Sequence, residues 1–268
     1  MNVEPPVLAL ALHPFRELPT PPGVERVAQD GFLLDVSPYP SAQIVEPLDL
    51  EPTEVPAAVA AARAIARDRD KRILAWWISS EHAHLVPGLE DEGLVNRDTP
   101  GFEATENAMV LIEPPNAGFD PAIGVSEVES YDDYVAAMYV LMDAFAIPDE
   151  MRAEAVPEFP KRWAEYTTPG NPARQYVAKI GDEVVGTAGA AIGDAGINLF
   201  GGSVAEHARG RGVYRALTAA RWDEAARRGS PALTVQAGRM SMPILAKLGF
   251  APVGQVRVYV DEVDGDGG

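Results

Sequence analysis

Cysteine is absent from this chain of 268 residues, and lysine is scarce, with four among the 22 basic residues. The lack of cysteine excludes disulfide bonds, thiolate-bound metals and a cysteine nucleophile. No long apolar run is present: the N-terminal stretch at 7–12 is too short to cross a bilayer, and no basic leader or cleavage site accompanies it. These absences predict a soluble, cytoplasmic protein.

Basic residues are outnumbered by acidic ones, which gives a formal net charge of −18. Nucleic acids and anionic membranes are bound by neutralising their phosphates with Lys and Arg, so neither is expected as a partner. Histidine is also rare. His82 and His84 are two of four, and no third ligand stands near them in a metal-binding pattern, so no metal site is predicted.

What the chain does have is 47% hydrophobic residues and enough length for two domains of about 120–150 residues each. A segment rich in proline and glycine at 114–122 predicts a linker, with one domain at 1–116 and another at 117–268. Residues 1–23, with prolines at both ends, are expected to be irregular or an edge segment. The apolar patterns predict strands and helices in both halves. The strands are expected at 31–36, 42–48, 73–79, 107–113, 123–128, 174–180, 183–192, 197–206, 232–238 and 255–263, and the main helices at 57–69, 85–94, 131–145, 148–166, 213–228 and 241–249.

A weak internal repeat relates the two halves. Helix 57–69, strand 73–79, residues 89–94 and strand 107–113 follow the same order as helix 213–228, strand 232–238, residues 245–250 and strand 255–263. The halves differ in the loop before the helix. Residues 46–56 of the first half hold four acidic residues, three prolines and no glycine, so this loop would repel a phosphate.

In the second half, strand 197–206 leads through Arg209-Gly210-Arg211-Gly212 into the long helix, which ends at Gly229. The first N–H groups of a helix have no internal partner, and the helix dipole adds positive charge there. Glycines let successive N–H groups converge on one anion. This loop predicts a phosphate or pyrophosphate site. Two interpretations are open for Gly201-Gly202 just before it: a β-bulge, or a close approach of the backbone.

Two blocks of residues carry a resemblance to a known family. Val204, followed by Arg209 to Tyr214, and then Lys247-Leu248-Gly249-Phe250, resemble the two signature blocks of the GCN5-related N-acetyltransferase (GNAT) superfamily. The resemblance covers about 140 residues of the second half, and the whole chain is similar to tandem GNAT proteins with a degenerate N-terminal copy.

The resemblance implies an α/β (α+β) fold of two GNAT-like domains, each a mixed sheet flanked by helices. It implies acetyl-CoA as the acyl donor and co-substrate, with its pantetheine arm between two splayed strands. The acceptor would be a small-molecule or peptidyl amine that attacks the thioester directly, and a homodimer is left open. The cofactor-binding residues implied are Val204, Arg209, Gly210, Arg211, Gly212, Val213 and Tyr214.

The chain departs from the family at its acid and base positions. Leu245 stands where a proton-donating tyrosine is common, and Asn198 is the one polar side chain on strand 197–206 before Ser203, where a carboxylate base is often found. Tyr214 replaces a small residue, so its ring must turn away from the phosphates. No catalytic residue is therefore assigned. Two hypotheses follow: an N-acetyltransferase, or an acyl-CoA-binding sensor or scaffold without turnover.

Several other residues have two interpretations. Ser241 could donate a proton in place of the tyrosine, but its position favours a helix N-cap. Glu206 and His207 beside the loop are expected to be solvated surface residues. The tyrosines and methionines of helix 131–145 are expected in the core. Contact with the acceptor is the alternative, because in the GNAT family this helix borders the acceptor site.

Overall fold

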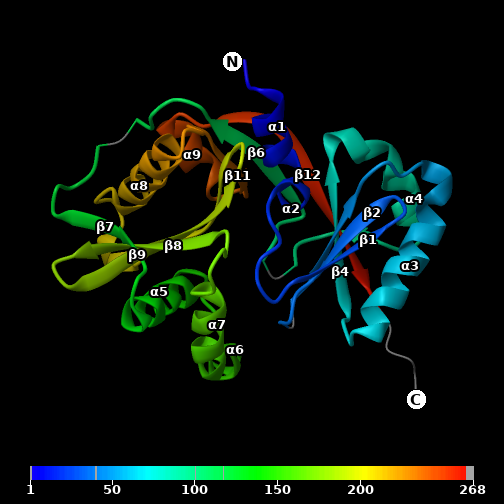
Figure 1. The fold of residues 1–268 in the computed structure, drawn as a ribbon, viewed down its shortest axis with the longest axis horizontal. Helices are drawn as coiled ribbons and strands as arrows, with labels where there is room; N and C mark the ends of the chain where they lie inside the picture. The colour runs from blue at the N-terminus through cyan, green and yellow to red at the C-terminus, as the bar shows by residue number, and fades with distance from the viewer. Residues whose placement is uncertain (1, 40, 100, 117, 264–268) are drawn as a thin grey trace.

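One continuous sheet of twelve strands runs through the computed structural model, which describes residues 2–39, 41–99, 101–116 and 118–263 (Figure 1). Its order is β1-β2-β3-β4-β12-β6-β11-β10-β9-β8-β7, and β5 pairs with β12 beside this row. Two neighbouring pairs, β3–β4 and β10–β11, are parallel, and the others are antiparallel, which confirms a mixed sheet. The strands are β1 Glu25–Gln29, β2 Phe32–Val36, β3 Gln43–Pro47, β4 Ile73–Ser79, β5 Val95–Asn96, β6 Thr105–Leu111, β7 Ile123–Glu127, β8 Ala173–Ile180, β9 Glu183–Gly193, β10 Gly196–Val204, β11 Leu233–Ala237 and β12 Ala251–Glu262.

Helices cover both faces of this sheet. One face carries α3 and α4 in the first half and α8 and α9 in the second; the other carries α1 and α2 near the middle and α5 to α7 under the second half (Figure 1). The helices are α1 Pro5–Leu12, α2 Pro14–Glu17, α3 Val55–Asp68, α4 Val86–Asp91, α5 Tyr131–Ala144, α6 Asp149–Ala155, α7 Phe159–Tyr166, α8 Val213–Arg227 and α9 Met242–Leu248. Short 3₁₀ turns are η1 Pro52–Glu54, η2 Ser80–Leu85, η3 Val156–Glu158 and η4 Glu206–Ala208.

The predicted repeat is visible in the fold, because α3, β4, α4 and β6 follow the same order as α8, β11, α9 and β12. The two halves nevertheless exchange their last strands. β6, from the first half, pairs with β11 of the second half, and β12, from the second half, pairs with β4 of the first. β6 and β12 also pair with each other. The two halves thus share one sheet, and the domain boundary at 116/117 stays a prediction, since residue 117 lies outside the described residues.

The N-terminal segment differs from its prediction, because it folds into α1 and α2 rather than staying irregular. Its prolines do not prevent this. Pro5 and Pro6 stand in the first turn of α1, where a missing N–H breaks no helical hydrogen bond. α1 then buries Leu10, Ala11 and Leu12 against the sheet. The apolar run at 7–12 is thus the buried side of a helix across the middle of the sheet.

Candidate functional site

The glycine-arginine loop joins β10 to α8, as predicted from the sequence. Gly210 and Gly212 have φ angles of 83° and 90°, a left-handed conformation that glycine adopts without the clash of a Cβ. A Cβ at Gly210 would meet nothing within 4 Å, whereas one at Gly212 would lie 2.8 Å from the Cβ of Phe119. Gly210 is therefore needed for its backbone angle alone, and Gly212 also for a close approach of two chain segments.

The backbone N–H groups along this loop are free. From residue 210 to residue 215, none of them donates to an acceptor in the described part of the chain, and the next one, Ala216 N–H, donates to Gly212 O at 3.0 Å. A run of open donors at the start of a fifteen-residue helix, with the positive end of its dipole, fits an anion. The residues present thus suit the pyrophosphate of an acyl-CoA.

Next to the loop, β10 and β11 separate. They pair over residues 197–199 and 233–235 only, although β10 continues to Val204 and β11 to Ala237. The register of β10 against β9 also shifts between Phe200 and Ser203, which confirms the bulge interpretation of Gly201-Gly202. Unpaired backbone on two parting strands can bond an extended ligand as if it were an added strand.

The side chains of the loop point to different places. Val213 is buried, and its Cγ1 would lie 2.5 Å from a Cβ at Gly186, so it anchors α8 to the sheet. The Tyr214 ring turns inward onto β10: its Cε2 would lie 2.6 Å from a Cβ at Gly202. Burial there raises the pKa of the Tyr214 phenol. Tyr214 thus extends over the bulge, where the lack of a side chain on Gly202 makes room for the ring.

The linker of the sequence-based prediction contacts this loop, which the sequence did not suggest. The Arg211 guanidinium bonds the Asp120 carboxylate through Nη2 at 2.5 Å and Nε at 3.1 Å. Asp120 N–H donates to Arg211 O at 3.2 Å, and Arg215 Nη1 donates to Gly118 O at 2.9 Å. The pKa of Asp120 is lowered by the hydrogen bond from Ala122 N–H and by Arg211. One cation of the predicted site is therefore already paired with an acid of the chain.

Acid and base groups are scarce where the family resemblance would place them. Leu245 is fully buried in α9. Ser241 occupies the N-cap position of α9, but its hydroxyl donates to Gly238 O at 3.3 Å and does not cap the helix. Asn198 Nδ2 donates to Gln236 Oε1 at 3.1 Å, and Gln236 Nε2 donates to Ala11 O at 2.7 Å. The start of the splay is thus lined by two amides held in place by α1.

Glu206 and His207 beside the loop are surface groups, and His82 and His84 lie in η2 of the first half. Glu206 and His207 are exposed, and His207 pairs with Glu183 at 3.1 Å. His82 is buried beside Ser79, whereas His84 is exposed and bonds Glu81 O. No group of three or more His, Asp or Glu side chains among the described residues could hold a metal ion. In the same part of the chain, no helix is long and apolar enough to cross a membrane.

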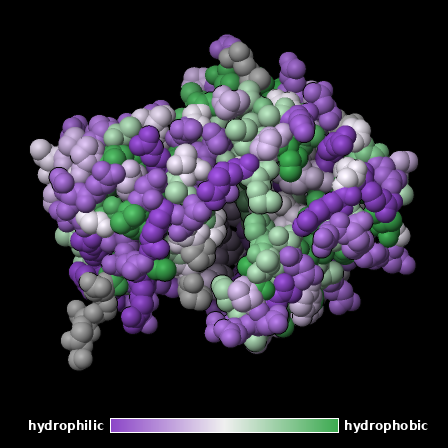
Figure 2. Space-filling view, turned by 180° about the vertical axis from the view of Figure 1, so that it is seen from behind, coloured by the Kyte–Doolittle hydropathy of each residue, from purple (hydrophilic) through white to green (hydrophobic). Residues whose placement is uncertain are grey.

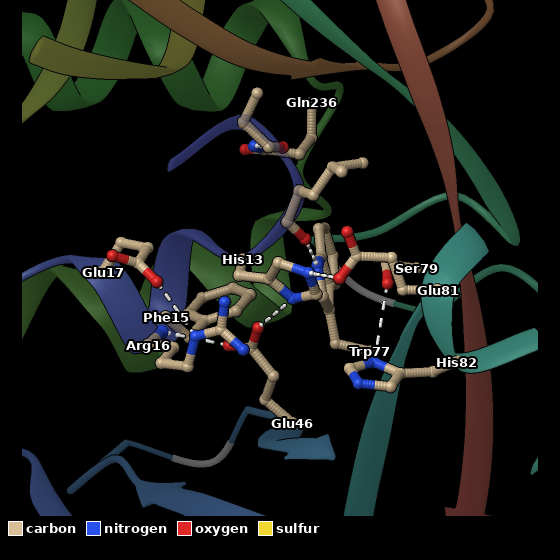
Figure 3. A network of polar contacts seen from close by, with 12 residues as sticks. His13, Phe15, Arg16, Glu17, Glu46, Trp77, Ser79, Glu81, His82 and Gln236 are labelled. Carbon is tan, nitrogen blue, oxygen red and sulfur yellow. Dashed lines mark hydrogen bonds and ion pairs between the residues drawn. The ribbon is translucent and has the colours of Figure 1, made fainter. Parts of the chain in front are cut away.

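In the first half, the corresponding opening between β3 and β4 is filled by the N-terminal segment (Figure 3). His13 Nδ1 lies 2.7 Å from Glu46 Oε1, and its Nε2 lies 3.1 Å from Glu81 Oε2. Arg16 N–H donates to the second Glu46 oxygen at 2.9 Å, and Trp77 Nε1 donates to Leu12 O at 3.0 Å. Burial raises the pKa of Glu46, and its bond to His13 opposes this. His13 and Glu46 are each 1% exposed, so the network leaves little room for a ligand.

The turn before α3 is also closed. Glu51 and Glu54 form a capping box, in which Glu51 N–H donates to Glu54 Oε2 at 3.0 Å. The N–H groups of Glu51 and Glu54 ahead of α3 are thus bonded to carboxylates, whereas the loop before α8 leaves its N–H groups open.

A family model and several solved structures match this chain. Residues 138–250 match the model of the Acetyltransferase (GNAT) family. A GCN5-related N-acetyltransferase from Kribbella flavida has a similar structure, with a TM-score of 0.71 and 16% identity, over 98% of this chain and 96% of its own. A tandem GNAT protein from the clavulanic acid biosynthesis pathway matches with a TM-score of 0.64 and 14% identity, over 97% of this chain and 89% of its own.

A functionally unknown conserved protein from Staphylococcus epidermidis also matches, with a TM-score of 0.65, 13% identity, and coverage of 95% and 99%. No curated protein matches the sequence. At these identities the structural matches establish the fold alone, and the family model covers residues 138–250 of the second half. The chain has a fold similar to that of a tandem GNAT protein, and residues 138–250 in its second half match the GNAT acetyltransferase family.

Proposed function

We propose that this protein is an acetyl-CoA-dependent N-acetyltransferase that transfers an acetyl group to an amine by direct attack. One observation carries the proposal: the open N–H groups of residues 210–215 lie next to the place where β10 and β11 separate. An acyl-CoA needs both features, a cradle for its pyrophosphate and strand edges for its pantetheine arm. When bound, acetyl-CoA would supply the acetyl group as a thioester.

The residues proposed to hold it are Val204 and the loop that follows. Val204 ends the splayed strand, and Gly210 and Gly212 shape the cradle. Arg209 is exposed and has no partner among the described residues, so it is available to a phosphate. Arg211 becomes available to a phosphate once its ion pair with Asp120 breaks. Val213 and Tyr214 contribute their backbone N–H groups, because their side chains are used in packing.

We propose the first half, residues 1–116, as a structural copy that binds no acyl-CoA, and 117–268 as the acyl-CoA domain. His13 and Glu46 in the first opening support this, as does the capping box before α3. A small-molecule or peptidyl amine is the proposed acceptor, in the cytoplasm and without a metal. A non-catalytic acyl-CoA sensor is the second candidate, and Leu245 favours it because leucine cannot protonate the leaving thiolate.

The loop is tested with two matched variants. Gly210 and Gly229 have φ angles of 83° and 81°, and a Cβ at either would meet nothing within 4 Å. Gly210→Asp adds a negative charge to the cradle, whereas Gly229→Asp adds the same charge at the other end of α8. A charge about 6 Å from two phosphate charges costs at least about 1.4 kcal/mol in water, or about tenfold in affinity. Calorimetric titration with coenzyme A should show that loss for Gly210→Asp only.

The two candidate functions are separated by turnover. Release of free thiol from acetyl-CoA in the presence of primary amines is expected for a transferase, whereas a sensor would bind acetyl-CoA without release. If the unmodified protein binds neither coenzyme A nor acetyl-CoA, both candidates are wrong.

A further inference from the structure

The exchange of strands brings an acidic residue of the first half beside the open strand of the second. β6 pairs with β11 so that Asn107 lies opposite Ala237 and Ala108 lies opposite Gln236. Glu106 is the next residue along β6, at the end of β11 that extends beyond its pairing with β10. Glu106 is therefore one strand away from the splay, although it comes from the half without a phosphate loop.

The Glu106 side chain lies on the face of the sheet that carries α1. Ala108 and Val110 pack against Ala11 and Leu12 of α1, and alternate residues of a strand share a face. Gln236 shares it too, since its amide bonds Ala11 O. Glu106 is a diagonal neighbour of Gln236, at roughly 7 Å by strand geometry. Asn198, Gln236 and Glu106 thus form a polar row across β10, β11 and β6.

The Glu106 carboxyl is buried, but only one of its two oxygens accepts a hydrogen bond within the described residues. It is 7% exposed, and one oxygen, Oε1, accepts a hydrogen bond from Glu103 N–H at 3.2 Å. Nothing among the described residues donates to Oε2. Burial raises the pKa of Glu106 to about 7, with a smaller contribution from the charge of Glu103, which itself pairs with Arg239. A group that titrates near neutral pH suits proton transfer, as a fully paired carboxylate does not.

Apolar side chains lie beside Glu106 on the side toward β12 and β4. Phe102, which comes shortly before β6, packs with Phe15 and Trp77, and their ring centroids lie 5.1 to 6.3 Å apart. Val256 lies opposite Glu106 on β12. Seen from behind, the molecule has a hollow between its two halves, with apolar residues along part of its rim (Figure 2). A buried carboxylate that has an unbonded oxygen and apolar side chains on one side suits a ligand that combines one positive charge with a hydrocarbon part.

We propose that Glu106 binds the ammonium group of the acceptor and takes its proton, which supplies from the first half the base that β10 lacks. The inference rests on the proposed function and names its acceptor class, a primary amine with an apolar or aromatic substituent. The ammonium gives one proton to Glu106 Oε2 and becomes a neutral amine. With acetyl-CoA bound, its nitrogen forms a bond to the thioester carbon, the bond from carbon to sulfur breaks, and the leaving sulfur takes the second proton from nitrogen.

The test compares Glu106→Gln with Glu46→Gln. Both changes remove one buried carboxylate from the same face of the sheet, but Glu46 is held by His13 and Arg16 N–H, whereas Glu106 has a free oxygen. Glutamine at 106 keeps an acceptor for Glu103 N–H. Phenethylamine and hexylamine serve as probes, and 2-phenylethanol is the uncharged control. Carbon-13 NMR of labelled glutamate carboxyls follows the Glu106 titration directly, so this readout does not depend on turnover.

We expect each ammonium probe to lower the pKa of Glu106 by about one unit or more, and 2-phenylethanol to leave it unchanged. In thiol release, Glu106→Gln should lower kcat by about 10²–10⁴ and remove the dependence on a group with a pKa near 7, while Glu46→Gln retains both. Coenzyme A should bind equally to all three proteins.

Two results would overturn the assignment: a Glu106 titration that neither amine moves, or thiol release that survives Glu106→Gln with its pH profile intact. If the unmodified protein does not bind coenzyme A, the proposed function itself is wrong.

Discussion

Replacing Glu106 by glutamine should make the folded protein more stable at alkaline pH, in addition to any effect on activity. In the folded chain burial raises the pKa of Glu106 from 4.5 to about 7. The carboxyl therefore binds its proton more tightly when folded than when unfolded, so protonation favours folding. This contribution is fully present below pH 4.5 and is lost as the pH rises through 7.

The magnitude follows from the same two values. An interval from 4.5 to about 7, at about 1.4 kcal/mol per pKa unit, amounts to about 3 kcal/mol. Glutamine has the shape of the protonated acid and does not titrate. We expect the variant and the unmodified protein to have similar free energies of unfolding at pH 4.5, and the variant to be more stable by about 3 kcal/mol at pH 8.5.

Urea unfolding at intervals between these pH values measures this difference. Groups away from Glu106 titrate alike in both proteins, so the difference between the two curves reports on Glu106 and its neighbour Glu103. Glu129→Gln, which removes an exposed carboxylate, controls for the loss of one charge from a chain of net charge −18. A difference that stays flat from pH 4.5 to 8.5 would mean that water reaches the carboxyl freely, and would refute the argument that burial tunes it.

Two further predictions concern the linker and the first half. Asp120→Asn should release Arg211 from its carboxylate partner and tighten coenzyme A binding severalfold, more at low than at high salt, as measured by calorimetric titration; weaker binding would mean that Asp120 shapes the cradle. His13→Ala leaves Glu46, which is 1% exposed, without its imidazole partner, so the free energy of unfolding should fall by about 3–5 kcal/mol in urea titrations while coenzyme A binding is retained. A loss below about 1 kcal/mol would contradict the view that this network holds the first opening closed.

The contrast between the halves suggests why one fold is used twice in this chain. The second half keeps an open loop and an open splay, which leave backbone donors without partners. The first half closes both, through the capping box of Glu51 and Glu54 and through His13 against Glu46. Through the exchanged strand β6, it also brings Glu106 to the second half. If both proposals hold, the first half stabilises the protein and supplies one catalytic group, Glu106.

Local sequence was enough to predict much of this protein. Gly210 and Gly212 predicted a curled loop before a helix, and in the structure both adopt left-handed φ angles, which glycine enters freely. The strands and helices of the second half follow from apolar periodicity, and a bulge was one of the two interpretations of Gly201-Gly202. The acidic stretch 46–56 predicted a first half without an anion loop. All of these depend on residues close together in the chain.

Only the tertiary structure decided the rest. Pro5 and Pro6 begin a helix, because the sheet offers an apolar surface for Leu10 to Leu12 to cover, and sequence alone cannot show that surface. Asp120 meets Arg211 across 91 positions of the chain, and Glu106 comes beside β11 because antiparallel register, which is set by long-range packing, aligns the two strands. Composition gives no sign of either contact. The sequence thus determined the loop where we propose that an acyl-CoA binds, and the fold decided which acidic residues lie beside that loop.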